Sequence, residues 1–350
     1  MKKIVLTLDY ELYGNGSGDV FKHIIGPTKN LLRICSLHHA HMTIFFEVVE
    51  YWKLKEEWEH GNRMGYEKNP ITAIEEQLQY AYLEGHDIQL HIHPQWVDAV
   101  WKDERWIVNN DEWRLGEFRN NSYDQLLELM KRGKQTIEEI IRPINANYEC
   151  IILRAGGYNV QPSGNIIKAM KALGMKVDSS IVPGAVEKGI LSQYDFSEVP
   201  IDIGMWECGN CLEEKGCNDI FEIPIVTFPI HRWRKYLSWG RIISLMQNRK
   251  SAKETFNAKT NISNENKSRL FVKIRFFLEK EYQTWDFCLF SKSLHRKYIK
   301  EISEQNNRDI ICLVGHPKSL ASTTSLNYLL EHLQGEYKTL TDIIHEIKQG

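Results

Sequence analysis

The sequence contains no apolar run that approaches the roughly 20 residues with which a helix crosses a membrane. It also leaves no room for an export signal, because Met1 and Lys2 lead directly into a strand-like apolar segment at residues 3–8. A signal peptide needs an apolar region and a cleavage site before the folded part begins. These two absences predict a cytoplasmic protein that is not embedded in a membrane.

Cysteine offers no basis for a disulfide framework. The 350 residues include seven cysteines, and an odd number without an export signal is typical of reduced thiols. Cys208, Cys211 and Cys217 lie close together in the sequence and would suit a structural zinc site. No fourth ligand is evident beside them, so three reduced cysteines in a loop are the simpler interpretation.

Nucleotide-binding motifs are missing as well. Glycine is frequent in residues 14–18, but this loop lacks the Lys-Ser/Thr ending of a phosphate-binding loop. No Gly-x-Gly-x-x-Gly sequence follows any early strand, which argues against a doubly wound dinucleotide-binding sheet. We therefore expect residues 14–18 to form a flexible wall of a cleft, and we expect no nucleic-acid partner.

Short apolar segments alternate with helix-like segments, a pattern typical of parallel strands joined by helical crossovers. The clearest strands are residues 3–8, 42–46, 88–91, 150–153 and 309–315. Polar residues recur at the C-terminal strand ends, where barrel enzymes carry their chemistry. These residues are Asp9, His91, Arg154, Asp178 and His316. The pattern predicts an α/β protein with a (β/α) barrel, complete or incomplete.

Basic residues are concentrated in one segment, although the net charge is only −2. Residues 232–300 contain 17 Lys and Arg but 5 Asp and Glu. We expect a single barrel domain over residues 1–350 with a basic helical insertion at residues 230–300, before the last barrel strand. The insertion is either a solvated surface or a contact for an anionic partner, such as an anionic membrane.

His91 and His93 project from one face of the third strand end, because alternate side chains of an extended chain share a face. Two imidazoles on one face can share a metal ion, and an open catalytic site usually adds a carboxylate. Asp9 and Glu11 follow the first strand and also share a face, so we expect these two strands to finish side by side. The alternatives are polar loop histidines and acids that cap the following loop.

Five motifs then occur in the order found in one enzyme family. They are Thr7-Leu8-Asp9-Tyr10-Glu11, Gly85-His86-Asp87 leading to His91, the stretch from Arg154 to Tyr158, Asp178-Ser179-Ser180, and Leu313-Val314-Gly315-His316. With these motifs the chain resembles the polysaccharide deacetylase superfamily (NodB-homology, carbohydrate esterase family four), in a divergent WalW-like branch. The resemblance covers most of residues 1–230 and 305–345. It implies a distorted seven-stranded (β/α) barrel and a metal-dependent hydrolase that removes acetyl groups from N-acetylated sugars.

The resemblance also implies catalytic roles for three residues. Asp9 matches the catalytic base, Arg154 resembles the arginine that orients this base, and His316 resembles the general acid. Each has a plainer alternative: Asp9 as a loop cap, Arg154 as a structural ion-pair partner, and His316 as a turn residue. Asp178 matches a loosely defined family position, and we expect it to brace the barrel.

The metal ligands depart from the family pattern. His91 matches the first metal-binding histidine, but the usual aspartate and second histidine are replaced by Tyr10 and Gln95. We therefore expect Glu11 and His93 to serve as the other two ligands. The ion would be divalent, with Zn²⁺ as the first choice and Co²⁺ or Ni²⁺ as alternatives.

Three aromatic residues near these motifs are candidates for binding the substrate. Trp96, Tyr158 and Tyr10 could lie beside the sugar, because aromatic faces pack on pyranose rings, and core packing is the alternative. The leading hypothesis is a deacylase acting on an N-acylated amino-sugar intermediate of surface polysaccharide or glycolipid synthesis. The basic insertion could then also hold a phosphate-linked sugar carrier. The alternatives are a hydrolase of another small amide, and a non-catalytic carbohydrate-binding or scaffolding protein on an inactivated barrel.

Overall fold

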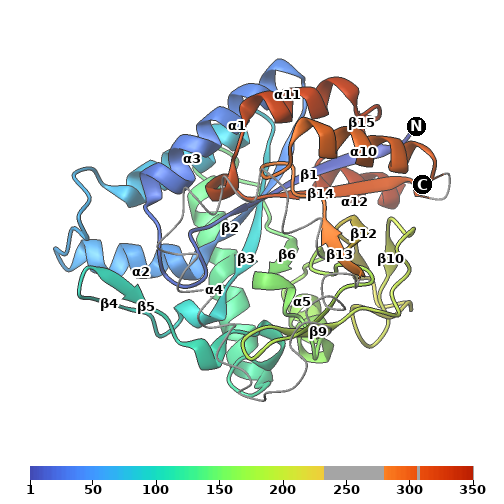
Figure 1. Ribbon diagram of the computed structural model, residues 1–350. Helices are drawn as coiled ribbons and strands as arrows, with labels where there is room; N and C mark the ends of the chain where they lie inside the picture. The colour runs from blue at the N-terminus through green and yellow to red at the C-terminus, as the bar shows by residue number, and fades with distance from the viewer. Residues whose placement is uncertain (232–279, 306–307, 350) are drawn as a thin grey trace, which may run out of the picture.

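A curled parallel sheet forms the centre of the protein (Figure 1). The computed structural model describes residues 1–231, 280–305 and 308–349. Within these residues the main sheet has nine strands, of which β10 (Trp206–Glu207) and β15 (Glu336–Tyr337) are short additions at its margins. The other strands all run parallel, in the order β11 (Phe221–Glu222), β7 (Val177–Asp178), β6 (Ile152–Ala155), β3 (Asp87–Ile92), β2 (Met42–Glu47), β1 (Lys3–Tyr10) and β14 (Ile310–Gly315).

The chain after β11 closes the sheet on itself. Phe221 and Glu222 pair with β7, and Ile225 then forms a parallel bridge to Cys312 of β14. The Val226 amide donates to the Cys312 carbonyl at 2.8 Å, so the two edges of the sheet are joined. The predicted distorted (β/α) barrel is confirmed.

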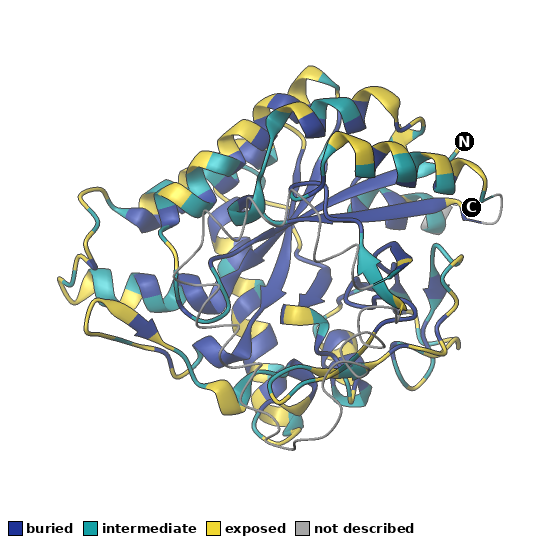
Figure 2. Ribbon diagram, viewed as in Figure 1, coloured by how far each residue is buried: buried dark blue, intermediate teal, exposed yellow. Residues whose placement is uncertain are grey.

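Helices cover the outside of the barrel (Figure 2). They bury one side against the strands and turn charged side chains outward, while the strands themselves are buried almost throughout. The helices are α1 (Gly26–Leu37), α2 (Val48–Glu59), α3 (Pro70–Leu83), α4 (Tyr123–Ile141), α5 (Gly164–Ala172), α10 (Lys292–Ser303), α11 (Thr323–His332) and α12 (Leu340–Gln349).

Helix α4 illustrates the pattern, because Leu126, Met130, Ile137 and Ile141 recur at helical spacing and are all buried.

Three antiparallel sheets of two strands each lie beside the main sheet in the described residues. They are β4 (Val100–Lys102) with β5 (Arg105–Ile107), β8 (Val186–Lys188) with β9 (Gln193–Asp195), and β12 (Thr227–His231) with β13 (Lys280–Thr284). The last sheet pairs strands on either side of residues 232–279.

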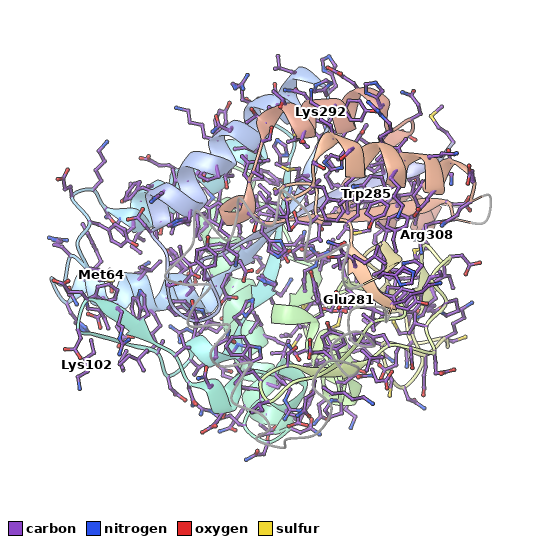
Figure 3. All side chains as sticks on the ribbon, in the orientation of Figure 1. Met64, Lys102, Glu281, Trp285, Lys292 and Arg308 are labelled. Atoms are coloured by element: carbon purple, nitrogen blue, oxygen red, sulfur yellow. The ribbon has the colours of Figure 1, made fainter. Side chains whose placement is uncertain are left out.

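The basic segment is only partly within the described residues. Its residues 232–279, and with them the predicted helical insertion and its anionic contact, lie outside. Residues 280–300 form β13, a short link and the first part of α10. Glu281, labelled in Figure 3, lies on β13, and Trp285 in the same view is fully buried. Asp286 forms a parallel bridge to Val314 of β14. Among the described residues, no helix is long and apolar enough to cross a membrane.

Two buried acids lie side by side on β7 and β11. Asp178 and Glu222 are register neighbours, and both are fully buried. Asp178 accepts hydrogen bonds from the Ser180 amide (3.0 Å) and hydroxyl (2.9 Å), and Glu222 accepts one from the Ile181 amide (3.0 Å). Burial raises the pKa of Asp178 to about 6. Burial and the neighbouring Asp178 raise the pKa of Glu222 well above its ordinary value. The pair fits the bracing role expected for Asp178.

This acid pair predicts a loss of stability as the pH rises. A carboxyl whose pKa is higher in the folded than in the unfolded state holds an extra proton when folded, so it opposes folding as the pH rises through that range. Glu222→Gln removes one ionisable member and should stabilise the protein at pH 8 relative to pH 5, by roughly 1 to 3 kcal/mol. Urea unfolding of both proteins at the two pH values measures the difference.

The exposed Glu198→Gln is the matched control and should leave the pH dependence unchanged. An identical pH dependence for wild type and Glu222→Gln would contradict the interpretation.

Candidate metal centre

The C-terminal end of β1 supplies two carboxylates, and the C-terminal end of β3 supplies two imidazoles. Asp9 lies on β1 and Glu11 directly follows it, while His91 lies on β3 and His93 continues it in extended conformation. The two strands are not neighbours, because β2 lies between them in the sheet. The expectation that they finish side by side is therefore wrong. The side chains meet because the sheet curls and all four residues lie at one end of the barrel.

Glu11, His91 and His93 form a compact group of ligand atoms. One oxygen of Glu11 and one nitrogen of each histidine all lie within 4.8 Å of one another, and the three residues are buried. Glu11 Oε2 lies 2.6 Å from His93 Nε2 and 3.4 Å from His91 Nε2. Neither Nε2 atom makes a hydrogen bond of acceptable geometry within the described part of the chain. Buried nitrogens without hydrogen-bond partners beside a carboxylate suit a divalent cation.

The other ring nitrogen of each histidine is held by a neighbour. His91 Nδ1 lies 2.9 Å from the carbonyl oxygen of Arg154, which can only accept, so the ring proton belongs on Nδ1 and Nε2 is free to bind a metal. His93 Nδ1 lies 2.9 Å from the amide nitrogen of Gln95. A half-turn of this amide would place Gln95 Oε1 to accept a proton from Nδ1. Burial lowers the pKa of His93 despite the charge of Glu11, which favours the neutral ligand form.

Two further acids support the metal-binding segments from behind. Glu47, at the end of β2, accepts a hydrogen bond from the His93 amide at 2.7 Å. Glu50, in the first turn of α2, accepts one from the Leu12 amide at 2.9 Å. Burial raises the pKa of Glu50 to about 8, and burial together with Glu50 raises the pKa of Glu47. The sequence signal for Glu47 was an acid directly after a buried strand, the same signal that pointed to Asp9.

The predicted base and its arginine are in direct contact. Arg154 Nη1 donates to Asp9 Oδ1 at 2.7 Å and to the Thr7 hydroxyl at 2.7 Å. Burial alone would raise the pKa of Asp9, but the charges of Arg154, His91 and His316 outweigh it, so the pKa lies below its ordinary value. The second oxygen, Asp9 Oδ2, is 3.5 Å from His316 Nε2. Asp9 is therefore held charged, with one oxygen left to face the site.

His316 has a partner that the sequence did not reveal. Its Nδ1 lies 2.9 Å from Asp286 Oδ2, while the other Asp286 oxygen accepts the amides of Cys288 (2.9 Å) and Leu289 (3.0 Å). Burial would lower the pKa of His316, but the hydrogen bond and charge of Asp286 raise it above its ordinary value. The available signal was a single acid within the apolar stretch of residues 285–290.

The predicted substrate-binding aromatics lie in different surroundings. Tyr10 is 1% exposed, its hydroxyl donates to Gln77 Oε1 of α3 at 3.0 Å, and its ring packs on Phe46. Trp96 is also 1% exposed and packs edge-to-face on Trp106. Both rings belong to the core, so neither has a free face for a sugar, and these two predictions are corrected. The strand alternation explains Tyr10, because a residue between Asp9 and Glu11 must point the opposite way.

Tyr158 is half-buried and lies close enough to Asp9 and Asp286 for their charges to raise its pKa further, although burial is the main cause. It is the aromatic residue of the three that remains a candidate for substrate contact.

The three clustered cysteines do not form a metal site in the described residues. Cys208 is buried, Cys211 is half-buried and Cys217 is exposed, and all are free thiols. Across residues 1–231, 280–305 and 308–349, Glu11, His91 and His93 are the group of three that could hold an ion.

Comparison with known proteins gives a likeness of structure alone. No protein-family model matches the chain, and a search of curated proteins finds no match. Similar solved structures include a protein described as a polysaccharide deacetylase from Mycobacterium smegmatis, with TM-score 0.48 and 13% identity over 99% of this chain and 90% of that one. A second protein so described, from Pseudomonas aeruginosa PAO1, has TM-score 0.47 and 10% identity over 99% and 91% of the two chains.

PuuE allantoinase is also similar, with TM-score 0.46 and 10% identity over 99% of this chain and 90% of that one. Polysaccharide deacetylases are the family that the sequence motifs resemble.

The arrangement predicts different effects for two histidines of the same site. His91→Ala removes an inward-facing ligand nitrogen, so bound divalent metal should fall from a stoichiometric amount to a trace. His316→Ala should leave the metal in place, because His316 is 4.0 Å from Glu11 and is held by Asp286. Metal analysis after dialysis against zinc measures both.

Equal metal loss in the two variants would reassign His316 as a ligand. Full retention in His91→Ala would place any metal elsewhere.

Proposed function

We propose that the protein is a metal-dependent hydrolase that removes an N-acyl group, most simply N-acetyl, from an amino sugar. One observation carries the proposal. The Asp9–Arg154 pair and the His316–Asp286 pair converge on the Glu11–His91–His93 group, with Asp9 Oδ2 only 3.5 Å from His316 Nε2. A base, an acid and a metal-ligand set at one point are the parts that amide hydrolysis requires.

The metal would supply electrophilic chemistry. Glu11, His91 and His93 would hold a divalent cation, which when bound would polarise an acyl carbonyl and lower the pKa of water. The donor set of two imidazoles and one carboxylate is that of an open catalytic zinc site.

The remaining steps belong to side chains of this chain. Asp9 accepts a proton from water at Oδ2, because Oδ1 is bound by Arg154. Arg154 keeps that carboxylate charged and fixes its direction. His316 donates a proton from Nε2 to the departing nitrogen, while Asp286 holds the opposite ring nitrogen and favours the protonated form. Tyr158, whose pKa the charge of Asp9 raises further, is the residue that we propose for substrate contact.

The amino-sugar substrate is proposed from the motif resemblance. The pathway of surface polysaccharide or glycolipid synthesis and the membrane contact, both expected from the sequence, stay predictions. A hydrolase of another small amide would use the same groups. Metal-loaded protein should release acetate from members of a panel of N-acetylated nucleotide sugars and lipid-linked sugars. Release should stop with a chelator and with Asp9→Asn. If only non-sugar amides are cleaved, the substrate class is wrong; if a metal-loaded protein cleaves none, the non-catalytic alternative is favoured.

Asp286 predicts a shift in the pH dependence of turnover. Its carboxylate raises the pKa of His316, and an acid that must be protonated loses activity as the pH rises through its pKa. Asp286→Asn should therefore move the alkaline limb of kcat to lower pH and reduce kcat at pH 8 by roughly 10-fold or more. Asparagine can keep the hydrogen bonds from the Cys288 and Leu289 amides, so the loop should be retained.

Metal content serves as the control and should match wild type. An unchanged alkaline limb would show that Asp286 does not set the protonation of His316.

A further inference from the structure

Lys318 reaches from the loop after β14 to the metal-ligand group. It lies two residues beyond His316, in the short helix η6 (Pro317–Ser319). Its Nζ is 2.8 Å from Glu11 Oε1 and also donates to the Leu12 carbonyl. The side chain is only 10% exposed. No motif pointed to this residue, and the contact joins two residues that are 307 positions apart in the sequence.

Neighbouring groups hold both the ammonium group and the backbone of Lys318. Its Nζ lies 5.4 Å from the centre of the Tyr13 ring, and the Tyr13 hydroxyl donates to the Lys318 carbonyl at 3.4 Å. The ammonium group thus has a carboxylate, a carbonyl and an aromatic face around it. A lysine held in this way is not a mobile surface side chain, so its contact with Glu11 is a fixed part of the site.

Because of this contact, the two carboxylate oxygens of Glu11 have different partners. Oε1 is bound by Lys318, whereas Oε2 is the oxygen that faces His93 and His91, at 2.6 and 3.4 Å. A carboxylate can bind a metal through one oxygen or through both. With Oε1 committed to an ammonium group, one oxygen is left.

We propose that Lys318 is a positioning residue that holds Glu11 as a one-oxygen metal ligand. It acts through Glu11 and does not touch substrate. Its effect is to keep the coordination number low, so that positions remain open for water and for the acyl oxygen. This inference rests on the proposed metal-dependent function, because it assigns a role within the same ligand set.

The test uses Co²⁺ as the metal, because its visible absorption is strong in four-coordinate sites and weak in six-coordinate ones. Wild type, Lys318→Met and Lys318→Arg are prepared metal-free, loaded with Co²⁺ alone, and compared per bound ion. Methionine keeps the length and apolar stem but removes the charge and the donors. Arginine keeps the charge and the hydrogen-bond donors. Lys53→Met, on the surface of α2 where it pairs with Glu56, is the matched control.

Lys318→Met should bind Co²⁺ with absorption per ion reduced severalfold, because Glu11 can then bind through both oxygens. Lys318→Arg and Lys53→Met should keep the wild-type intensity. Circular dichroism verifies folding, and Lys318→Gln replaces Lys318→Met if the latter does not fold.

Unchanged intensity in folded Lys318→Met would overturn the inference, and so would loss of Co²⁺ from it, since Lys318 would then be needed for binding itself. If wild type binds no Co²⁺, the proposed function fails instead, so the two failures are distinguishable.

Discussion

The rest of the structure depends on the contacts of one arginine, Arg154, in the interior of the barrel. The Arg154 guanidinium is fully buried and donates to Asp9, Thr7 and Ser179, which belong to β1 and to the segment after β7. It also lies over the Phe45 ring of β2 at 4.1 Å. Its own backbone carbonyl accepts a hydrogen bond from Nδ1 of His91, on β3. Removing one partner of such a buried ion pair typically costs 3–5 kcal/mol, so the geometry of the base and the stability of the barrel are inseparable.

Each candidate metal ligand is held on the side away from the other two ligand atoms, where the proposed metal would lie. The Arg154 carbonyl orients His91, Gln95 contacts the rear nitrogen of His93, and Lys318 binds the rear oxygen of Glu11. The Arg154 carbonyl fixes the tautomer of His91, and all three contacts fix the direction of the side chain that they hold, which reduces the reorganisation that metal binding would require. Glu11 and His93, which differ from the motif that the sequence resembles, thus have partners of their own.

The sequence predicted the residues that lie at strand ends and missed those that arrive from elsewhere. Asp9, Glu11, His91, His93 and His316 could be found because parallel strands bring their C-terminal ends to one side of a barrel. Asp286 could not, since it lies in a segment interpreted as part of an insertion, and its contact with His316 depends on how the barrel closes at Val314. Lys318 was missed because the sequence alone does not show that β14 pairs with β1, and this pairing brings the loop after β14 beside Glu11. Tyr10 and Trp96 were misassigned where alternation and core packing outweighed an attractive motif.

The most direct test of the account is an X-ray anomalous-scattering measurement on crystals grown with Zn²⁺. The account predicts a single strong peak bounded by Glu11 Oε2 and the Nε2 atoms of His91 and His93. An absence of any peak between these atoms, or a peak at Cys208 and Cys211 instead, would contradict it.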